Sequence, residues 1–162
     1  MYGYAEKILR VDLTSGQMEA VDYDTSLLRR YVGGTGMGAR FLFDEVEAGV
    51  AWDDVENGIF IFNGPLSATV IGGSGTFSIV FKGPMTDLAG ATQASGMFGA
   101  FLKLAGYDGI IVKGRASDWT YLYVDPEGTP YLKDASSFIG LSTRETERAV
   151  TEQVGLSPSQ LS

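Results

Sequence analysis

Apolar and polar residues follow one another along this chain in short stretches that glycine- and proline-containing turns separate. Alternating or continuous apolar runs are typical of strands, whereas apolar residues three or four positions apart are typical of helices. The pattern predicts strands over 5–13, 17–23, 59–62, 77–82, 109–113, 120–124 and 129–133, and helices over 26–32, 35–46, 97–105 and 142–154. Hairpins therefore precede and follow the helices, without a regular alternation of strand and helix.

Two local patterns sharpen this expectation. Ile59–Phe62 is a continuous apolar run, which indicates a strand buried on both faces. Ser142 and Glu145 have the spacing of a capping box, so a helix should begin there. The order of elements favours an α+β fold with largely antiparallel sheets, and the length of 162 residues fits a single domain over residues 1–162.

Composition and charge exclude several classes of function. The net charge is −8, which argues against a nucleic-acid partner. Since no apolar run approaches the ~20 residues of a membrane span and the amino terminus lacks a signal-peptide core, we expect a cytoplasmic protein without a membrane partner. The chain has no cysteine and no histidine. It therefore cannot supply a Cys-ligated iron–sulfur cluster, a Cys/His zinc site, a Ser-His-Asp triad or a cysteine nucleophile.

A series of short motifs extends over nearly the whole chain. In order they are Met1-Tyr2-Gly3-Tyr4, Lys7–Leu13, Tyr31-Val32-Gly33-Gly34-Thr35-Gly36, Asn63-Gly64-Pro65-Leu66, Lys82-Gly83-Pro84-Met85-Thr86, Gly96-Met97-Phe98-Gly99-Ala100, Leu102-Lys103, Ala105-Gly106-Tyr107-Asp108 and Asp134-Ala135-Ser136. Each motif alone is weak, but their order and spacing are specific. With them the chain resembles the N-terminal domain of the tungsten-containing aldehyde:ferredoxin oxidoreductase family.

The resemblance implies a two-sheet base domain with short helices, across which the two pterins of the cofactor lie. The implied cofactor is a tungsten (or molybdenum) bis-pterin with a bridging magnesium. Members of the family oxidise aldehydes to carboxylic acids and pass electrons to ferredoxin. Their cluster cysteines and most catalytic acids belong to later helical domains, so we expect neither an iron–sulfur cluster nor a catalytic residue on this chain.

The same resemblance bears on partners. In the family, a further strand and a phosphate loop follow the helix that corresponds to residues 142–154, and both would come after Ser162. We therefore expect a fragment, a split-gene subunit or a reduced paralogue, whose open sheet edge favours association. The expected partner is a larger cysteine-bearing oxidoreductase chain or a second copy of this chain, with ferredoxin reached only indirectly.

The first candidate cofactor segment is the glycine-rich loop that ends at Gly75. Backbone N–H groups of such a loop can cradle a phosphate. In the family an arginine follows this loop and pairs with the pterin phosphate, but this sequence has Thr76 there. Losing one charge-assisted hydrogen bond removes roughly 1.5–3 kcal/mol. The alternative is that the loop is a simple connector between two strands.

The second candidate segment corresponds to a family Asn-Ser-Gly-Gly stretch that contacts the pterin and the magnesium. Gln93 keeps an amide, Ser95 replaces a glycine, and Gly96 is retained. The resemblance thus gives Gly75, Gln93, Ser95 and Gly96 as candidate cofactor-binding residues. The alternative for this segment is an ordinary helix cap, in which the Ser95 side chain caps the helix that begins near Met97.

Two other patterns have simpler explanations. Gly34-Thr35-Gly36 with Ala39 imitates a dinucleotide fingerprint, but it follows a helix instead of a strand, which favours a close helix crossing. The acidic residues Asp53, Asp54 and Glu56 fit a solvated loop better than a metal site. Three functions remain open: a tungstopterin-cradling domain or subunit, a non-catalytic structural or assembly paralogue that has lost pterin binding, and an unrelated small-ligand module.

Overall fold

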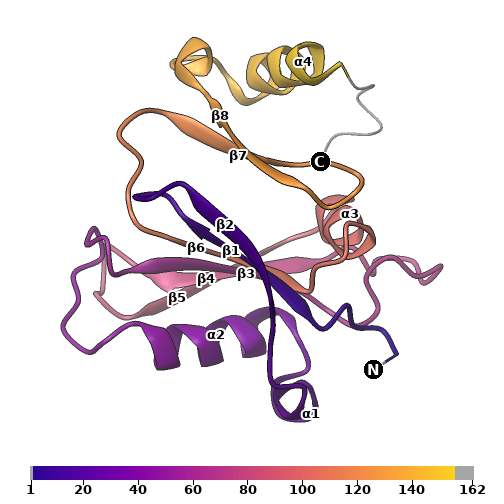
Figure 1. The fold of residues 1–162 in the computed structure, drawn as a ribbon. Helices are drawn as coiled ribbons and strands as arrows, with labels where there is room; N and C mark the ends of the chain where they lie inside the picture. Colours follow the sequence, from indigo (N-terminus) through magenta and orange to yellow (C-terminus); the bar gives the residue numbers. More distant parts are fainter. Residues whose placement is uncertain (1, 156–162) are drawn as a thin grey trace.

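The computed structural model describes residues 2–155. Its strands form one six-stranded sheet in the order β2-β1-β6-β3-β4-β5 and a separate two-stranded sheet, β7-β8 (Figure 1). All neighbouring strands in these sheets pair antiparallel except β1 and β6, which are parallel. The predicted α+β fold with two largely antiparallel sheets is therefore confirmed. The strands are β1 (Lys7–Asp12), β2 (Gln17–Asp22), β3 (Gly58–Asn63), β4 (Phe77–Lys82), β5 (Ala89–Ala94), β6 (Gly109–Lys113), β7 (Thr120–Val124) and β8 (Pro130–Asp134).

The helices cover both faces of the large sheet. They are α1 (Ser26–Tyr31), α2 (Gly34–Glu45), α3 (Phe98–Leu104) and α4 (Thr143–Val154), with a short 3₁₀ turn, η1 (Ser136–Phe138). Figure 1 shows α1 and α2 on one side of the sheet, and α3 and the β7-β8 hairpin on the other. Within residues 2–155 no helix is both long enough and apolar enough to cross a bilayer.

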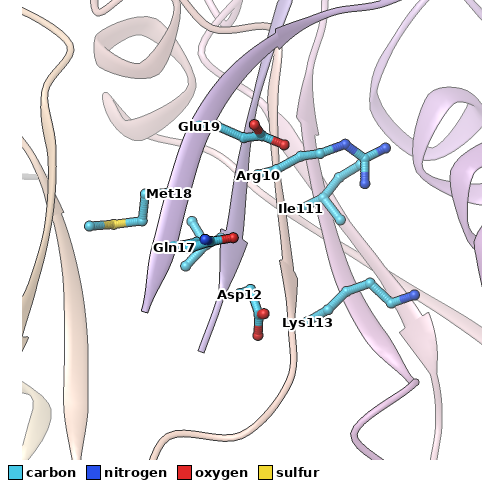
Figure 2. A pocket seen from close by; sticks show the side chains of 8 residues that line it. Arg10, Asp12, Gln17, Met18, Glu19, Ile111 and Lys113 are labelled. Atoms are coloured by element: carbon cyan, nitrogen blue, oxygen red, sulfur yellow. The ribbon is translucent and has the colours of Figure 1, made fainter. Parts of the chain in front are cut away.

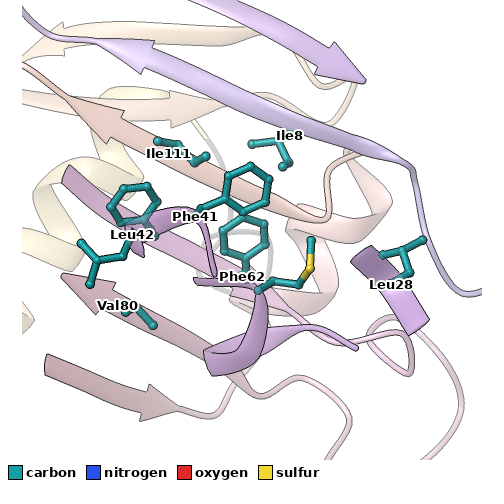
Figure 3. Close-up of a cluster of buried hydrophobic side chains, with 9 residues drawn as sticks. Ile8, Leu28, Phe41, Leu42, Phe62, Val80 and Ile111 are labelled. Atoms are coloured by element: carbon teal, nitrogen blue, oxygen red, sulfur yellow. The ribbon is translucent and has the colours of Figure 1, made fainter. Parts of the chain in front are cut away.

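Two apolar clusters hold these layers together. The cluster under α1 and α2 contains Phe41 and Phe62, whose rings are stacked with centroids 5.3 Å apart (Figure 3). The other lies between the large sheet, α3 and the β7-β8 hairpin, and its buried residues are Leu9, Val11, Leu102, Tyr107 and Ile110. Strands β1, β3 and β6 contribute side chains to both clusters, so they lie at the centre of the molecule.

The glycines at the start of α2 allow close packing. A Cβ on Gly36 would lie 2.4 Å from the Tyr31 carbonyl oxygen of α1, and one on Gly38 would lie 2.6 Å from Val80 Cγ2 of β4. Side chains at these positions would force the backbones apart. Gly36 of the fingerprint-like pattern thus serves a close helix crossing, as expected, and the nearby Gly38 lets α2 approach strand β4 as well.

The structure differs from the prediction at three places. Strand β5, which runs Ala89-Gly90-Ala91-Thr92-Gln93-Ala94, was not predicted, because its small and polar residues carry no apolar alternation and only its pairing with β4 makes it a strand. Helix α1 ends at Tyr31, one residue before the expected end, and its C-cap is Val32, with a φ of 61°. Helix α2 then begins at Gly34, one residue before the expected start.

Asp108 ties the amino-terminal segment to the sheet and to α3. Its buried carboxylate accepts hydrogen bonds from the backbone N–H groups of Ala5 (3.1 Å) and Glu6 (2.7 Å) and from the Tyr23 hydroxyl (2.9 Å). Lys103 of α3 pairs with the same carboxylate. Burial, and next the charge of Asp108, raise the pKa of the Tyr23 hydroxyl, so this tyrosine stays a protonated donor. This cluster joins residues that are far apart in the sequence.

The capping box predicted at the start of α4 is present. The Ser142 side chain accepts from the Glu145 backbone N–H, and the Glu145 carboxylate accepts from the Ser142 backbone N–H at 2.8 Å. The Ser142 hydroxyl, followed by its backbone N–H, lowers the pKa of the Glu145 carboxyl. Because this pKa is depressed in the folded state, the stabilisation is present above the ordinary carboxyl pKa and is lost as the pH falls through the lowered value.

We expect Ser142→Ala to lower the free energy of unfolding by about 1 kcal/mol at neutral pH, since it removes the cap of α4. The difference between this variant and the parent protein should shrink as Glu145 becomes protonated in acid. Urea denaturation followed by circular dichroism at several pH values measures both effects. Ser137→Ala, at an exposed serine of η1, is the control; an equal loss in both variants contradicts the assignment of the cap.

Candidate functional site

The four candidate cofactor-binding residues lie together at one end of strands β4 and β5. The register of these strands pairs Phe77 with Ala94, so the chain just before β4 runs beside the chain just after β5. As a result the hydroxyl oxygens of Thr76 and Ser95 are 3.1 Å apart and hydrogen-bonded. Sheet pairing therefore brings together two segments that the sequence separates by some twenty residues.

Backbone contact between glycines defines the inner wall of this site. A Cβ on Gly75 would lie 2.0 Å from the Gly96 carbonyl oxygen, and a Cβ on Gly99 would lie 2.7 Å from the Gly75 carbonyl oxygen. Distances under 3 Å leave no room for a side chain. The close approach of the two loops therefore requires glycine at position 75. A loop that only joined two strands would not need a glycine there.

Helix α2 contributes a third side to the site. The Gln93 amide donates to the Thr35 hydroxyl at 3.4 Å, and the Thr35 hydroxyl donates to the Ser78 hydroxyl at 3.0 Å. Sequence reasoning did not single out Thr35 or Ser78 as site residues. The position of Thr35 in the Gly-Gly-Thr-Gly motif was the one sequence signal that pointed to it. The sequence does not reveal its contact with Gln93, because that contact depends on how α2 packs against β4.

Ser95 does not cap the following helix, so that alternative is wrong. Helix α3 begins at Phe98, its N-cap is Met97, and no side chain caps it. Ser95 lies two residues before the cap, and Gly96, with a φ of 142°, turns the chain between them. The Ser95 hydroxyl faces Thr76 instead, which leaves it at the opening between the two loops.

The groups that converge here are polar but uncharged. Thr76, Gln93 and Ser95 offer hydroxyl and amide groups, and between residues 57 and 102 the only basic residue is Lys82, at the opposite end of β4. Such donors can hydrogen-bond a pterin ring or a phosphate oxygen, but they do not neutralise its charge. The residues therefore fit a pterin cofactor as a close, glycine-lined cradle of neutral donors.

The acidic loop lies away from this site and is occupied by local contacts. A carboxylate oxygen of Asp54 accepts from the Glu56 backbone N–H at 2.9 Å, and the Asp53 carbonyl accepts from Arg115 at 2.6 Å. Among residues 2–155 there is no group of three or more carboxylates placed to hold a metal ion. These contacts agree with the interpretation of residues 53–56 as a solvated loop.

Two hollows elsewhere on the surface are not part of the site. One, of about 600 Å³, lies along β1, β2 and β6 (Figure 2), and its cations Arg10 and Lys113 are both bound to Glu45. The other, of about 770 Å³, lies between the end of β1 and the β7-β8 hairpin, beside Trp119. Neither is lined by a candidate cofactor-binding residue. Three of the four candidate residues, Gln93, Ser95 and Gly96, are exposed, so the site is open to solvent on that side.

Comparison with known proteins agrees with this architecture. The chain is 36% identical over 155 residues to the tungsten-containing aldehyde ferredoxin oxidoreductase of Pyrococcus abyssi, covering 96% of this chain and 25% of that protein. It is 33% identical over 159 residues to the aliphatic sulfonate oxidoreductase, WOR-like subunit, of Pyrococcus furiosus, covering 95% of this chain and 25% of that protein. The chain therefore spans about a quarter of the length of these relatives.

A solved structure shows the same fold. It is described as the active site complex BamBC of benzoyl coenzyme A reductase in complex with 1,5-dienoyl-CoA; it superposes with a TM-score of 0.91 at 30% identity and covers 95% of this chain and 23% of that one. Residues 8–162 match the family described as aldehyde ferredoxin oxidoreductase, N-terminal domain. The chain belongs to this family, as its motifs and its sheet topology both indicate.

Proposed function

We propose that this chain is the pterin-bearing base of an aldehyde ferredoxin oxidoreductase-like enzyme, completed by polypeptide beyond residues 1–162 or by another chain. The observation that carries the proposal is the convergence of Gly75, Gln93, Ser95 and Gly96 in one glycine-lined cradle. Relatives named as tungsten-containing enzymes support it, because they share this domain over nearly all of the chain. We further propose a cytoplasmic location for this chain.

The residues of the cradle would bind and orient a tungsten or molybdenum bis-pterin with its magnesium. When bound, that cofactor supplies the oxidation–reduction chemistry. The close backbone contact of Gly75 and Gly96 would hold the cofactor edge against the sheet, while the Gln93 amide and the hydroxyls of Thr76 and Ser95 would donate hydrogen bonds to it. The chain's own contribution is thus position and hydrogen bonding rather than proton transfer.

A second candidate is a non-catalytic structural or assembly subunit that has lost pterin binding. The observation that favours it is the absence of positive charge: Thr76 stands where the family has an arginine, and no other lysine or arginine lies within residues 57–81 or 83–102. A phosphate in this cradle would receive neutral hydrogen bonds only. Pterin content of the unmodified protein separates the two candidates: the first predicts that the protein retains pterin, and the second predicts that it does not.

Thr76→Arg tests where the cofactor phosphate binds. The new guanidinium should add about 1.5–3 kcal/mol of binding, or roughly one to two decades of affinity, because a charge-assisted hydrogen bond replaces a neutral one. Pterin content of the assembled protein, measured by fluorescence after oxidative release and dialysis, gives the result. Thr69→Arg places the same charge in an exposed part of the same loop, where the Thr69 hydroxyl makes local turn contacts with Leu66 and Ile71, and should leave the pterin content unchanged.

Two outcomes contradict the proposal. In one, neither the unmodified protein nor Thr76→Arg retains pterin, which leaves the cradle without a ligand. In the other, the Thr69 and Thr76 variants gain pterin equally, which would indicate general electrostatic attraction rather than a phosphate contact beside Gly75. If the unmodified protein holds no pterin and the Thr76→Arg variant does, the result supports the structural-subunit candidate.

A further inference from the structure

Both asparagines of this chain are followed by glycine. They are Asn57, before Gly58, and Asn63, before Gly64. In an Asn-Gly pair the backbone nitrogen of the glycine can attack the side-chain amide of the asparagine, because glycine has no Cβ to obstruct the approach. The product is a five-membered imide, which water opens to aspartate or isoaspartate. The folded structure decides which of the two pairs can react.

The side chain of Asn57 is folded back over the glycine that follows it. Its amide oxygen accepts a hydrogen bond from the Gly58 backbone N–H at 2.8 Å. Because a C=O bond is about 1.23 Å long, the Gly58 nitrogen lies within about 4 Å of the amide carbon. Rotation about χ2, which is a soft torsion in asparagine, turns the face of that carbon toward the nitrogen. The two reacting atoms are therefore already neighbours.

Solvent reaches Asn57. This residue is half-buried, and the six residues before it, 51–56, are all exposed. Asn57 ends the segment between α2 and β3, which contains no helix or strand of its own. Exposed segments of this kind open locally at a low free-energy cost. Water is therefore available both to take the proton of the Gly58 nitrogen and to open the imide.

Asn63 lies in surroundings that hinder the same reaction. It is 2% exposed, and its side-chain nitrogen donates to the carbonyl oxygens of Gly99 and Tyr107, both at 3.2 Å. Its buried amide oxygen has no hydrogen-bond partner among residues 2–155, so the Gly64 N–H does not donate to it. The Asn63 amide is thus held toward α3 and not toward the glycine that follows.

The Asn57 amide also fastens its loop to the sheet. The side-chain nitrogen donates to the Trp52 carbonyl oxygen at 2.6 Å and to the Lys82 carbonyl oxygen, at the end of β4, at 3.3 Å. An ionised aspartate has no hydrogen to donate, so a carboxylate at position 57 would face two carbonyl oxygens. It would also add negative charge to a loop that already carries three carboxylates within residues 53–56. Conversion of Asn57 therefore removes the link between this loop and β4.

We propose that Asn57 is a site of spontaneous deamidation, and that its conversion releases the loop of residues 50–57 from strand β4. The Gly58 nitrogen gives its proton to water and bonds to Asn57 Cγ. The Cγ–Nδ2 bond then breaks as the leaving nitrogen takes a proton from water, which releases ammonia. One water opens the imide, at Cγ to give aspartate or at the backbone carbonyl carbon to give isoaspartate. Asn57 contacts the end of β4 opposite the cradle, so this chemistry is independent of cofactor binding.

Mass spectrometry of the aged protein tests the selectivity between the two asparagines. Residues 41–82 form one tryptic peptide that contains both, because no lysine or arginine lies between Arg40 and Lys82. After incubation of the folded chain in warm neutral buffer, fragment ions should show aspartate and isoaspartate at position 57 at a level roughly tenfold or more above that at position 63. The peptide 41–82, incubated by itself in the same buffer, is the control and should react at both positions.

Two glycine variants test whether the contact between Asn57 and Gly58 sets the rate. Gly58→Ala puts a Cβ on the attacking residue, where the nearest atoms are Phe60 ring carbons at 3.0 Å, and should slow deamidation at position 57 several-fold. Gly64→Ala is the matched control, because its Cβ would meet no atom within 4 Å. It should leave the rate at position 57 unchanged.

Asn57→Asp tests the release of the loop, because it is one product of the reaction. Amide hydrogen exchange of residues 50–57 should be faster in this variant than in the parent protein. Ala51→Asp adds the same charge at an exposed position of the same loop while the Asn57 amide is kept. This control should exchange like the parent protein.

The proposal is overturned if Asn57 of the folded chain reacts no faster than Asn63. It is also overturned if the Gly58→Ala and Gly64→Ala variants deamidate at position 57 at the same rate, since the contact with Gly58 would then have no effect. Equal exchange of residues 50–57 in Asn57→Asp and Ala51→Asp overturns the release of the loop, because charge alone would then account for the change.

Discussion

Lys103→Met should lower the free energy of unfolding by about 3–5 kcal/mol, because the buried Asp108 carboxylate keeps its three neutral donors but loses the ammonium group that balances its charge. The side chains of Lys103 and Asp108 are 11% and 5% exposed, and Lys103 also donates to the Gly3 carbonyl at 3.1 Å. Loss of the ammonium group removes the pair and one tie to the amino-terminal segment. Urea denaturation of the isolated chain, followed by circular dichroism, measures the change.

Arg40→Met is the control for this effect. Arg40 and Asp44 form an ion pair at 2.7 Å on the surface of α2, with side chains 35% and 37% exposed. Exposed pairs of this kind contribute roughly 0–1 kcal/mol, since water and salt screen them. A loss of under 1 kcal/mol in Lys103→Met, or equal losses in the two variants, contradicts the structural role assigned to Asp108.

Gly75→Ala should reduce pterin retention on the order of 100-fold and should lower the free energy of unfolding by about 1–3 kcal/mol. The added Cβ would lie 2.0 Å from the Gly96 carbonyl oxygen, so the loop before β4 must move away from the end of β5. This displacement separates the hydroxyls of Thr76 and Ser95, which are the groups proposed to contact the cofactor. Pterin content of the assembled protein and the urea midpoint of the isolated chain give the two quantities.

Gly72→Ala is the matched control, because a Cβ there would meet no atom within 4 Å and the residue lies in the same loop. It should retain pterin like the unmodified protein. If both alanine variants retain pterin fully, the contact between Gly75 and Gly96 does not shape the cofactor site. If both variants lose pterin equally, the loss results from reduced flexibility of the loop and not from the close approach of Gly75 and Gly96.

Much of the fold could be predicted because the apolar pattern is local. Ile59–Phe62 announces strand β3 by its composition, and Ser142 with Glu145 announces the start of α4 by spacing alone. The expected burial of β3 on both faces is wrong at Ile59, which is 47% exposed. Strand β5 has no such signal: its side chains are small or polar, and it is a strand because β4 offers it hydrogen bonds. Val32 adopts a left-handed conformation that its side chain does not favour, because the junction between α1 and α2 requires it.

The candidate site could be predicted only in part for the same reason. The family motifs point to Gly75, Gln93, Ser95 and Gly96, and sheet pairing brings these residues together. Thr35 of α2 accepts a hydrogen bond from Gln93 and donates one to Ser78 of β4, and no spacing in the sequence announces these contacts.

The central claim is that this domain holds a tungsten or molybdenum pterin against its glycine-lined cradle. The most direct measurement is elemental analysis combined with pterin quantification on the assembly purified from the cells that encode it. The claim predicts tungsten or molybdenum and pterin in amounts stoichiometric with this chain, and loss of both in Gly75→Ala but not in Gly72→Ala. Metal and pterin at background level in the unmodified assembly would contradict it.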